Sequence, residues 1–279
     1  MLSNSLNFSG GPGALPWSVL EQTHAAVLAL PETGLSILGM SHRSAWFRDI
    51  LAEAEQNLRT LLNVPDGYSV IFLQGGSSLQ FSMIPMNFAA GSSVPAEFVI
   101  SGYWSGKAVG EAATIAPARA IWDGASQHYS TLPVLADLPR SQHAPFFHYV
   151  SNETVEGLQF NEVPESLGVP LIADMSSDFL SRPVDVSRYS MIYAHAQKNL
   201  GPAGVTVALK DGWDPLDNGL QWEINSVGYV NGEGADYVLA ILTYGSATES
   251  AGIAEVNGLA RLVWAALAPS PAPSPAPSA

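Results

Sequence analysis

The chain has 279 residues, 47% of them hydrophobic and 13% charged, which is enough apolar material for a sizeable core. Its formal net charge of −14 excludes a basic footprint, so neither nucleic acid nor an anionic membrane is expected as a partner. The absence of cysteine excludes disulfides, thiolate metal ligands and cysteine nucleophiles. The apolar runs are much shorter than the ~20 residues of a membrane span, and residues 1–16 do not resemble a signal peptide. We therefore expect a soluble, cytoplasmic protein without a metal site.

Helical and strand-like patterns alternate along the chain. Apolar residues recur at helical spacing in residues 17–30, 45–62 and 79–87. Short apolar runs, typical of buried strands, occupy residues 68–73, 97–101, 119–122, 146–150, 169–173, 191–194 and 205–209. Short apolar strands separated by helices are typical of an α/β fold with a mostly parallel sheet flanked by helices.

The domain organisation follows from where these patterns begin and end. Residues 1–15 are predicted to form an N-terminal arm and residues 16–268 one large domain. Within this domain, residues 211–268 are divergent, and residues 211–245 show no clear period. Residues 269–279 read PSPAPSPAPSA, a Pro/Ala/Ser tail that cannot bury a core and is predicted to be disordered.

Polar residues follow the predicted strands at the edge where open α/β sheets bind ligands. Gly75 and Gly76 precede Ser77 and Ser78 at the expected start of a helix, where backbone N–H groups and the helix dipole favour an anion. This segment is either a phosphate cup or an ordinary strand-to-helix turn with a capping serine.

Two further strand ends carry an acid and an amine. Asp174 ends the run VPLIAD, and Lys198 lies between a buried strand and a Gly/Pro turn. Either residue has an ordinary explanation as well, a capping or solvated acid and a lysine that reaches solvent. Together, however, a phosphate cup, an acid for the ring nitrogen and a lysine amine are what pyridoxal phosphate requires. Neighbouring strands lie ~4.8 Å apart, so the two side chains could reach opposite sides of one ring.

At these residues the sequence resembles the phosphoserine aminotransferases, class-V members of the fold-type-I pyridoxal-phosphate enzymes. The matching segments follow one another in order along the chain: NFSGGP (7–12), SHR (41–43), QGGSSLQF (74–81), GYW (102–104), SNETVEG (151–157), ADMSS (173–177) and QKNLGPAG (197–204). The resemblance implies the pyridoxal-phosphate-binding large domain of that fold, with the small C-terminal domain truncated or absent. It also implies a homodimer whose active site is shared across the interface.

The resemblance implies a role for each matching polar residue. Lys198 would form the Schiff base with the cofactor and move the proton of the transamination, and Asp174 would hold the ring nitrogen. The ring face, the ring hydroxyl and the phosphate would be bound by Trp104, by Thr154, and by Ser77, Ser78 and Gln197, respectively. His195 stands where the family usually has a small residue, and no role is carried over to it.

The substrate anion would be bound by His42 and Arg43, because the arginine offers a planar fork to a carboxylate or phosphate. A surface salt bridge is the ordinary explanation for Arg43. The implied reaction is amino transfer from O-phospho-L-serine to 2-oxoglutarate, which yields 3-phosphooxypyruvate and L-glutamate in serine biosynthesis and, in some bacteria, pyridoxine biosynthesis. Two alternatives stay open: a non-catalytic pyridoxal-phosphate-binding remnant, and a related class-V aminotransferase with another substrate.

Overall fold

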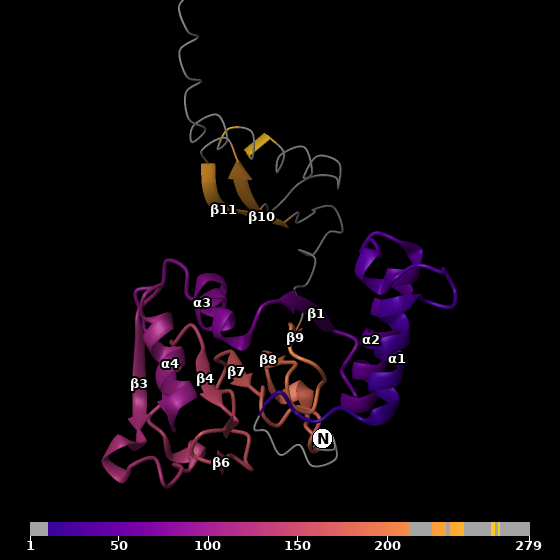
Figure 1. Cartoon of the computed structure of the whole chain (residues 1–279). Coiled ribbons are helices and arrows are strands. Elements are labelled where there is room, and N and C mark those ends of the chain that lie inside the picture. Colours follow the sequence, from indigo (N-terminus) through magenta and orange to yellow (C-terminus); the bar gives the residue numbers. More distant parts are fainter. Residues whose placement is uncertain (1–10, 212–224, 233–234, 243–257, 260–261, 263–279) are drawn as a thin grey trace, which may run out of the picture. The chain divides into compact units, whose positions relative to one another are not determined.

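The computed structural model describes residues 11–211, 225–232, 235–242, 258–259 and 262 (Figure 1). The chain divides into two compact units, Met1–Gly212 and Trp213–Ala279. The second unit contains the antiparallel pair β10 (Asn225–Gly232) and β11 (Ala235–Leu242). The predicted tail at 269–279 and most of the predicted arm lie outside the described residues.

The first unit is built on a seven-stranded sheet with the order β1-β9-β8-β7-β4-β2-β3 (Figure 1). Its strands are β1 (Tyr68–Gln74), β2 (Ala96–Ile100), β3 (Ala118–Asp123), β4 (Phe147–Val150), β7 (Leu171–Asp174), β8 (Met191–His195) and β9 (Val205–Asp211). Only β9 is antiparallel to its neighbours in this sheet, so the other six strands all end at the same edge. The mostly parallel sheet is confirmed, and all seven predicted strands are present. A short hairpin, β5 (Asn152–Glu153) with β6 (Leu158–Gln159), follows β4.

In the described part of the first unit, four α-helices accompany the sheet: α1 (Trp17–Leu28), α2 (Ala45–Leu62), α3 (Ser77–Phe88) and α4 (Tyr103–Ala112). Single turns of 3₁₀ helix occur at η2 (Ile37–Gly39), η3 (Gly124–Gln127), η4 (Leu135–Asp137) and η5 (Val186–Arg188). The three predicted helices are confirmed, but α4 was not predicted. Its buried face consists of Ser105, Ala108 and Ala112, small side chains that produce no apolar period in the sequence.

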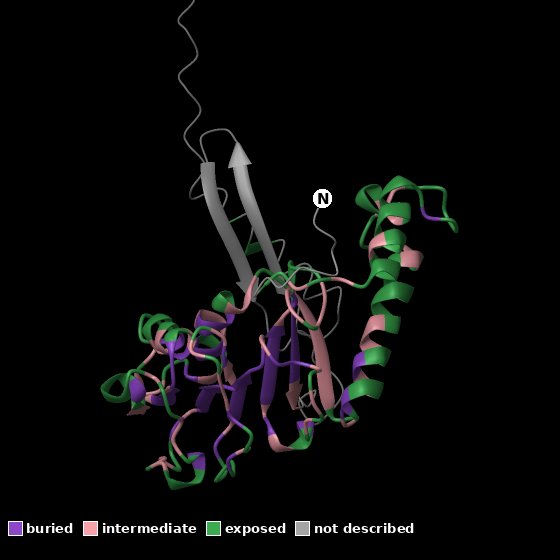
Figure 2. Cartoon of the chain, turned by 60° about the horizontal axis from the view of Figure 1, so that its bottom comes forward, coloured by how far each residue is buried: buried purple, intermediate pink, exposed green. Residues whose placement is uncertain are grey.

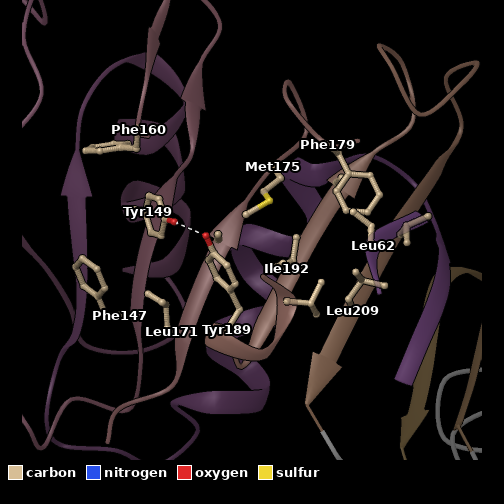
Figure 3. Close-up of a cluster of buried hydrophobic side chains, with 14 of the residues drawn as sticks. Leu62, Phe147, Tyr149, Phe160, Leu171, Met175, Phe179, Tyr189, Ile192 and Leu209 are labelled. Atoms are coloured by element: carbon tan, nitrogen blue, oxygen red, sulfur yellow. Dashed lines mark hydrogen bonds between the residues drawn. The ribbon is translucent and has the colours of Figure 1, made fainter. Parts of the chain in front are cut away.

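The two faces of the sheet bury different sets of side chains, because successive residues of a strand point to opposite sides. On one face, Leu171 of β7, Ile192 of β8 and Leu209 of β9 belong to a large cluster (Figure 3). On the other face, Ile172 and Tyr193 pack in a second cluster that includes Phe81 and Ile84 of α3. The sheet is therefore buried on both sides along its centre (Figure 2), as expected for parallel strands.

Helices α1 and α2 are largely exposed (Figure 2), although the C-terminal end of α2 contributes to the first core cluster. Helix α1 buries none of its side chains, and α2 buries only Leu58 and Leu62 near its C-terminal end. Large apolar side chains remain exposed on this pair and on the connection between them, among them Trp17 (68%), Leu38 (81%) and Leu61 (69%). Within the described ranges, no helix has the length and apolar character that would let it cross a bilayer.

Candidate active site

The carboxyl ends of β1, β2, β4, β7 and β8 converge on a pocket of about 350 Å³. This volume is within the usual range for small-molecule sites. All seven residues that the sequence assigned to cofactor binding line it: Ser77, Ser78, Trp104, Thr154, Asp174, Gln197 and Lys198. The structure thus brings together residues that are up to 121 positions apart, because parallel strands deliver their following loops to one edge.

The acid and the amine come from adjacent strands. Asp174 ends β7 and lies opposite Tyr193 of β8 in the register of the parallel pair. Lys198 follows the end of β8 by three residues, in the loop that leads to β9. The expectation that the two strands are neighbours is therefore confirmed, and both side chains face the same pocket.

The N-terminal segment lies against the lysine. The Gly13 N–H donates a hydrogen bond of 2.7 Å to the Gln197 carbonyl oxygen. A Cβ atom on Gly11, whose φ is +148°, would lie 3.2 Å from Lys198 Nζ. Glycine at position 11 therefore lets the backbone approach the amine closely in a conformation that other residues rarely adopt. Burial lowers the pKa of the Lys198 amine below its ordinary value of 10.5.

The carboxyl group of Asp174 is almost completely buried, with 4% of the residue exposed. One of its oxygens, Oδ1, accepts hydrogen bonds from the Ser176 N–H (2.8 Å) and the Ser176 hydroxyl (2.5 Å). Burial nevertheless raises its pKa from the ordinary 3.8 to about 6, because desolvation penalises the charged form more than these bonds favour it. At neutral pH the group is an ionised carboxylate held in a poorly solvated position.

This pKa predicts a pH-dependent stability difference between the cofactor-free protein and its Asp174→Asn variant. The folded state binds the Asp174 proton more tightly than the unfolded state, so the stabilising contribution of protonation is present below about pH 3.8 and lost as the pH rises through about 6. The raised pKa corresponds to about 3 kcal/mol. We therefore expect the variant to gain about this much stability relative to wild type between pH 4 and pH 8. Urea unfolding at the two pH values measures it, and a constant difference would contradict the burial argument.

The serines of the pocket connect its two sides. Ser77 and Ser78 open helix α3, whose N-terminal end faces the pocket. The Ser77 hydroxyl lies 2.5 Å from that of Ser176, which also accepts a 3.2 Å hydrogen bond from the His195 N–H. The dipole of α3 and the hydroxyl groups make this end of the pocket suitable for an anion.

Trp104 and Thr154 form another wall of the pocket, and Glu153 holds the tryptophan there. Trp104 lies in the first turn of α4, where its N–H donates to Glu153 Oε2 at 3.0 Å and the Ser105 N–H donates to Glu153 Oε1 at 2.9 Å. The Thr154 hydroxyl is hydrogen-bonded to that of Ser177. Glu153 is completely buried and satisfies two of the orphan N–H groups of the helix terminus, while the Tyr103 N–H donates to Glu156 Oε1 at 2.9 Å.

Sequence reasoning assigned no role to Glu153, to Ser176 or to the pocket-lining His195. The matching segments that contain Glu153 and Ser176 did point to this region, but residue type alone does not show which carboxylate caps a helix. Only the contacts of Glu153 with α4 and of Ser176 with Asp174 identify them as supports of the site.

His42 and Arg43 lie elsewhere. Both residues are exposed in the turn that precedes α2, and neither lines the pocket of its own chain. The Arg43 backbone N–H donates a hydrogen bond to the Ser41 hydroxyl oxygen (3.2 Å), and the Arg43 carbonyl oxygen accepts one from the Arg48 side chain (2.6 Å). Their role in substrate binding stays a prediction.

The Aminotransferase class-V family matches residues 5–212. The chain is similar to the phosphoserine aminotransferase of Niallia circulans, with 46% identity over 209 residues, which is 75% of this chain and 58% of the relative. It is also similar to the phosphoserine aminotransferase of Chromobacterium violaceum, with 48% identity over 204 residues, 73% of this chain and 56% of the relative.

The chain is also similar to solved structures of phosphoserine aminotransferases. The phosphoserine aminotransferase from Bacillus circulans subsp. alkalophilus is 46% identical, with a TM-score of 0.70 over 74% of this chain and 56% of that one. The pyridoxal-phosphate-bound phosphoserine aminotransferase from Trichomonas vaginalis is 35% identical, with a TM-score of 0.63 over 74% of this chain and 57% of the other. The chain therefore spans a little over half the length of these relatives. From the extent of the family match and the identity to these relatives, we conclude that this chain belongs to the class-V aminotransferase family.

Proposed function

We propose that this chain binds pyridoxal 5′-phosphate and transfers the amino group of O-phospho-L-serine to 2-oxoglutarate, giving 3-phosphooxypyruvate and L-glutamate. The observation that carries the proposal is the convergence of Asp174, Lys198 and the N-terminal end of α3 on one pocket. The names of the similar proteins support the choice of phosphoserine as substrate. Serine biosynthesis in the cytoplasm is the setting that the proposal implies.

The residues present fit the cofactor. A buried carboxylate, an amine with a lowered pKa and a helix N-terminus correspond to its ring nitrogen, its aldehyde and its phosphate. The seven predicted contacts all line a pocket large enough for a molecule of this size. When bound, the cofactor supplies an electron-withdrawing ring that stabilises negative charge on the substrate carbon.

The chain's own residues then have distinct tasks. The buried Asp174 carboxylate would accept a hydrogen bond from the ring nitrogen and would favour its protonated form, because opposite charges stabilise each other where water is excluded. Ser77 and Ser78 at the start of α3, together with Gln197, would bind the phosphate. Trp104 would cover the ring face and exclude water, and Thr154 would donate to the ring hydroxyl.

Lys198 carries the proton transfer. Its lowered pKa increases the neutral fraction of the amine at physiological pH, and only the neutral amine can act as a nucleophile or general base. Its Nζ is held beside the Gly11 backbone at the mouth of the pocket. From that position it can take a proton from one carbon and return it to the other.

We propose that the chain forms a homodimer, a proposal supported by the exposed helices and by the position of His42 and Arg43. Apolar side chains on α1, on η2 and on α2 are exposed in the single chain, and such surfaces mark association sites. His42 and Arg43 precede α2 and do not line their own chain's pocket. We infer that they bind the substrate anion in the pocket of a second copy.

Co-expression of two inactive variants tests this arrangement. Lys198→Ala and Arg43→Ala chains should each be inactive or strongly impaired as homodimers. In a mixed dimer, one site would then contain both defects and the other neither. Random mixing yields about half mixed dimers, so about one quarter of wild-type activity should return. No recovery, despite mixed dimers seen by native mass spectrometry, would refute the shared site.

The decisive test of the proposed function is a transamination assay of the full chain with phosphoserine and 2-oxoglutarate. Glutamate and 3-phosphooxypyruvate are the expected products. Cofactor binding without turnover would make this chain a pyridoxal-phosphate-binding protein, whereas turnover of another amino acid but not phosphoserine would identify a related aminotransferase. Failure to bind the cofactor would refute the proposal.

A further inference from the structure

Two buried polar side chains near Asp174 have no part in the proposed reaction. Tyr193 of β8 is completely buried and stands opposite Asp174 in the register of β7 and β8. Its hydroxyl interacts with the Asp174 carboxylate and favours the ionised form of that group. The same hydroxyl lies 2.9 Å from Nε2 of His148, which is 2% exposed.

The sheet register places the three side chains on one face. His148 of β4 pairs with Ile172 of β7, two residues before Asp174, so His148 and Asp174 point to the same side. Tyr193 extends across this face toward the histidine, and the two rings lie 6.0 Å apart, centroid to centroid, at an interplanar angle of 30°. The result is a continuous polar chain inside the cluster packed by α3.

The surroundings of His148 determine the direction of the donors. Among the described residues, none bonds to its Nδ1 atom, and the ring borders a void without space for water, lined by Phe81, Phe98 and Phe146. An N–H at Nδ1 would be a buried donor without an acceptor, so the proton belongs on Nε2. Burial lowers the pKa of His148 to about 3, which keeps the ring neutral.

The hydroxyl proton of Tyr193 is then left to donate to the Asp174 carboxylate. Its oxygen accepts from His148 Nε2–H, and its single proton donates to Asp174, which has only acceptor oxygens when ionised. This bond adds to the two that Ser176 donates to Oδ1. Tyr193 favours the ionised form of Asp174, whereas desolvation and the charge of Glu153 oppose it.

We propose that Tyr193 and His148 are positioning residues: their one-way chain of donors orients the Asp174 carboxylate toward the pocket and keeps it ionised for a cationic ring nitrogen. This inference rests on the proposed cofactor, since it concerns how the acid is prepared for the ring. Burying a histidine with one unpaired nitrogen among apolar side chains lowers the stability of the fold, whereas an aliphatic side chain would pack there without that cost. The hydrogen bond to Tyr193 accounts for its presence.

Tyr193→Phe removes the hydroxyl, and Tyr149→Phe is the matched control. Tyr149 is also buried, on β4 at the other side of β7, but its hydroxyl is hydrogen-bonded to that of Tyr189 at 2.9 Å on the opposite face of the sheet (Figure 3). In the cofactor-free full chain, the Asp174 pKa is read by carboxyl ¹³C NMR, with Asp174→Asn to assign the signal. Tyr193→Phe should raise it by about one unit and Tyr149→Phe should leave it unchanged. Equal values in all three proteins would overturn the inference.

A second readout uses two ligands, pyridoxal phosphate and its analogue with C–H in place of the ring nitrogen. Tyr193→Phe and His148→Phe should weaken binding of pyridoxal phosphate, by about tenfold for the tyrosine variant, and leave binding of the analogue unchanged. Equal weakening of both ligands would show that the two residues only support the fold. A wild-type chain that binds neither ligand would contradict the proposed function, while the Asp174 titration would still decide whether the donor chain exists.

Discussion

Replacing Lys198 by alanine should lower the transamination rate by about 10⁴-fold or more, because the chain then lacks both its nucleophilic amine and its proton carrier. The fold should survive, since Lys198 lies in a loop at the mouth of the pocket and not in either core cluster. Steady-state rates with phosphoserine and 2-oxoglutarate measure the first effect, and urea unfolding measures the second.

Lys107→Ala is the matched control. Lys107 is exposed on α4, with its Nζ 5.9 Å from the centroid of the Trp104 ring, and should be dispensable for the chemistry. Borohydride reduction of the loaded protein should attach the cofactor to Lys198, which peptide mass spectrometry detects. Attachment to Lys107 or Lys210, or substantial turnover by Lys198→Ala, would contradict the role of Lys198 as the cofactor-binding lysine.

Replacing Glu153 by alanine is the second change with a large expected effect, here on stability. It removes the acceptor of the Trp104 and Ser105 N–H groups and of the Ser101 hydroxyl. Unsatisfied buried donors and a lost helix cap together cost about 3 kcal/mol. For a domain of this size, we expect a Tm lower by roughly 10 °C. Because Trp104 sits in the same turn, cofactor affinity should fall as well.

Glu165→Ala provides the comparison for Glu153. Glu165 also carries a carboxylate, but 83% of its side chain is exposed and its partner Arg188 is 3.3 Å away, so a loss of under about 1 kcal/mol is expected. Glu153→Gln retains the shape and one acceptor oxygen and should lie between the two. Equal stability of the two alanine variants in thermal unfolding would mean that Glu153 does not hold α4.

The strands, three of the helices and the core of the site were predictable for a simple reason. Their signals are local: apolar runs for strands, helical spacing in 17–30, 45–62 and 79–87, and polar residues directly after strand ends. The rule that parallel strands end at one edge then brings Asp174 and Lys198 together without any coordinates. Helix α4 escaped prediction because its packing face of serine and alanine leaves no local signal.

Contacts between distant segments required the folded chain. Glu153 and Trp104 are 49 residues apart, and His148 and Tyr193 are 45 apart. Whether such pairs meet depends on strand order and on the register that assigns each side chain to a face, and a one-residue slip would move Tyr193 to the other side of the sheet. The same holds for Arg43: its residue type suggests an anion anchor, but its exposed position before α2 separates it from its own chain's pocket. The local sequence pattern was thus enough to predict which residues could carry the chemistry. Their burial, their side-chain contacts and the resulting pKa values arise only when the sheet is assembled.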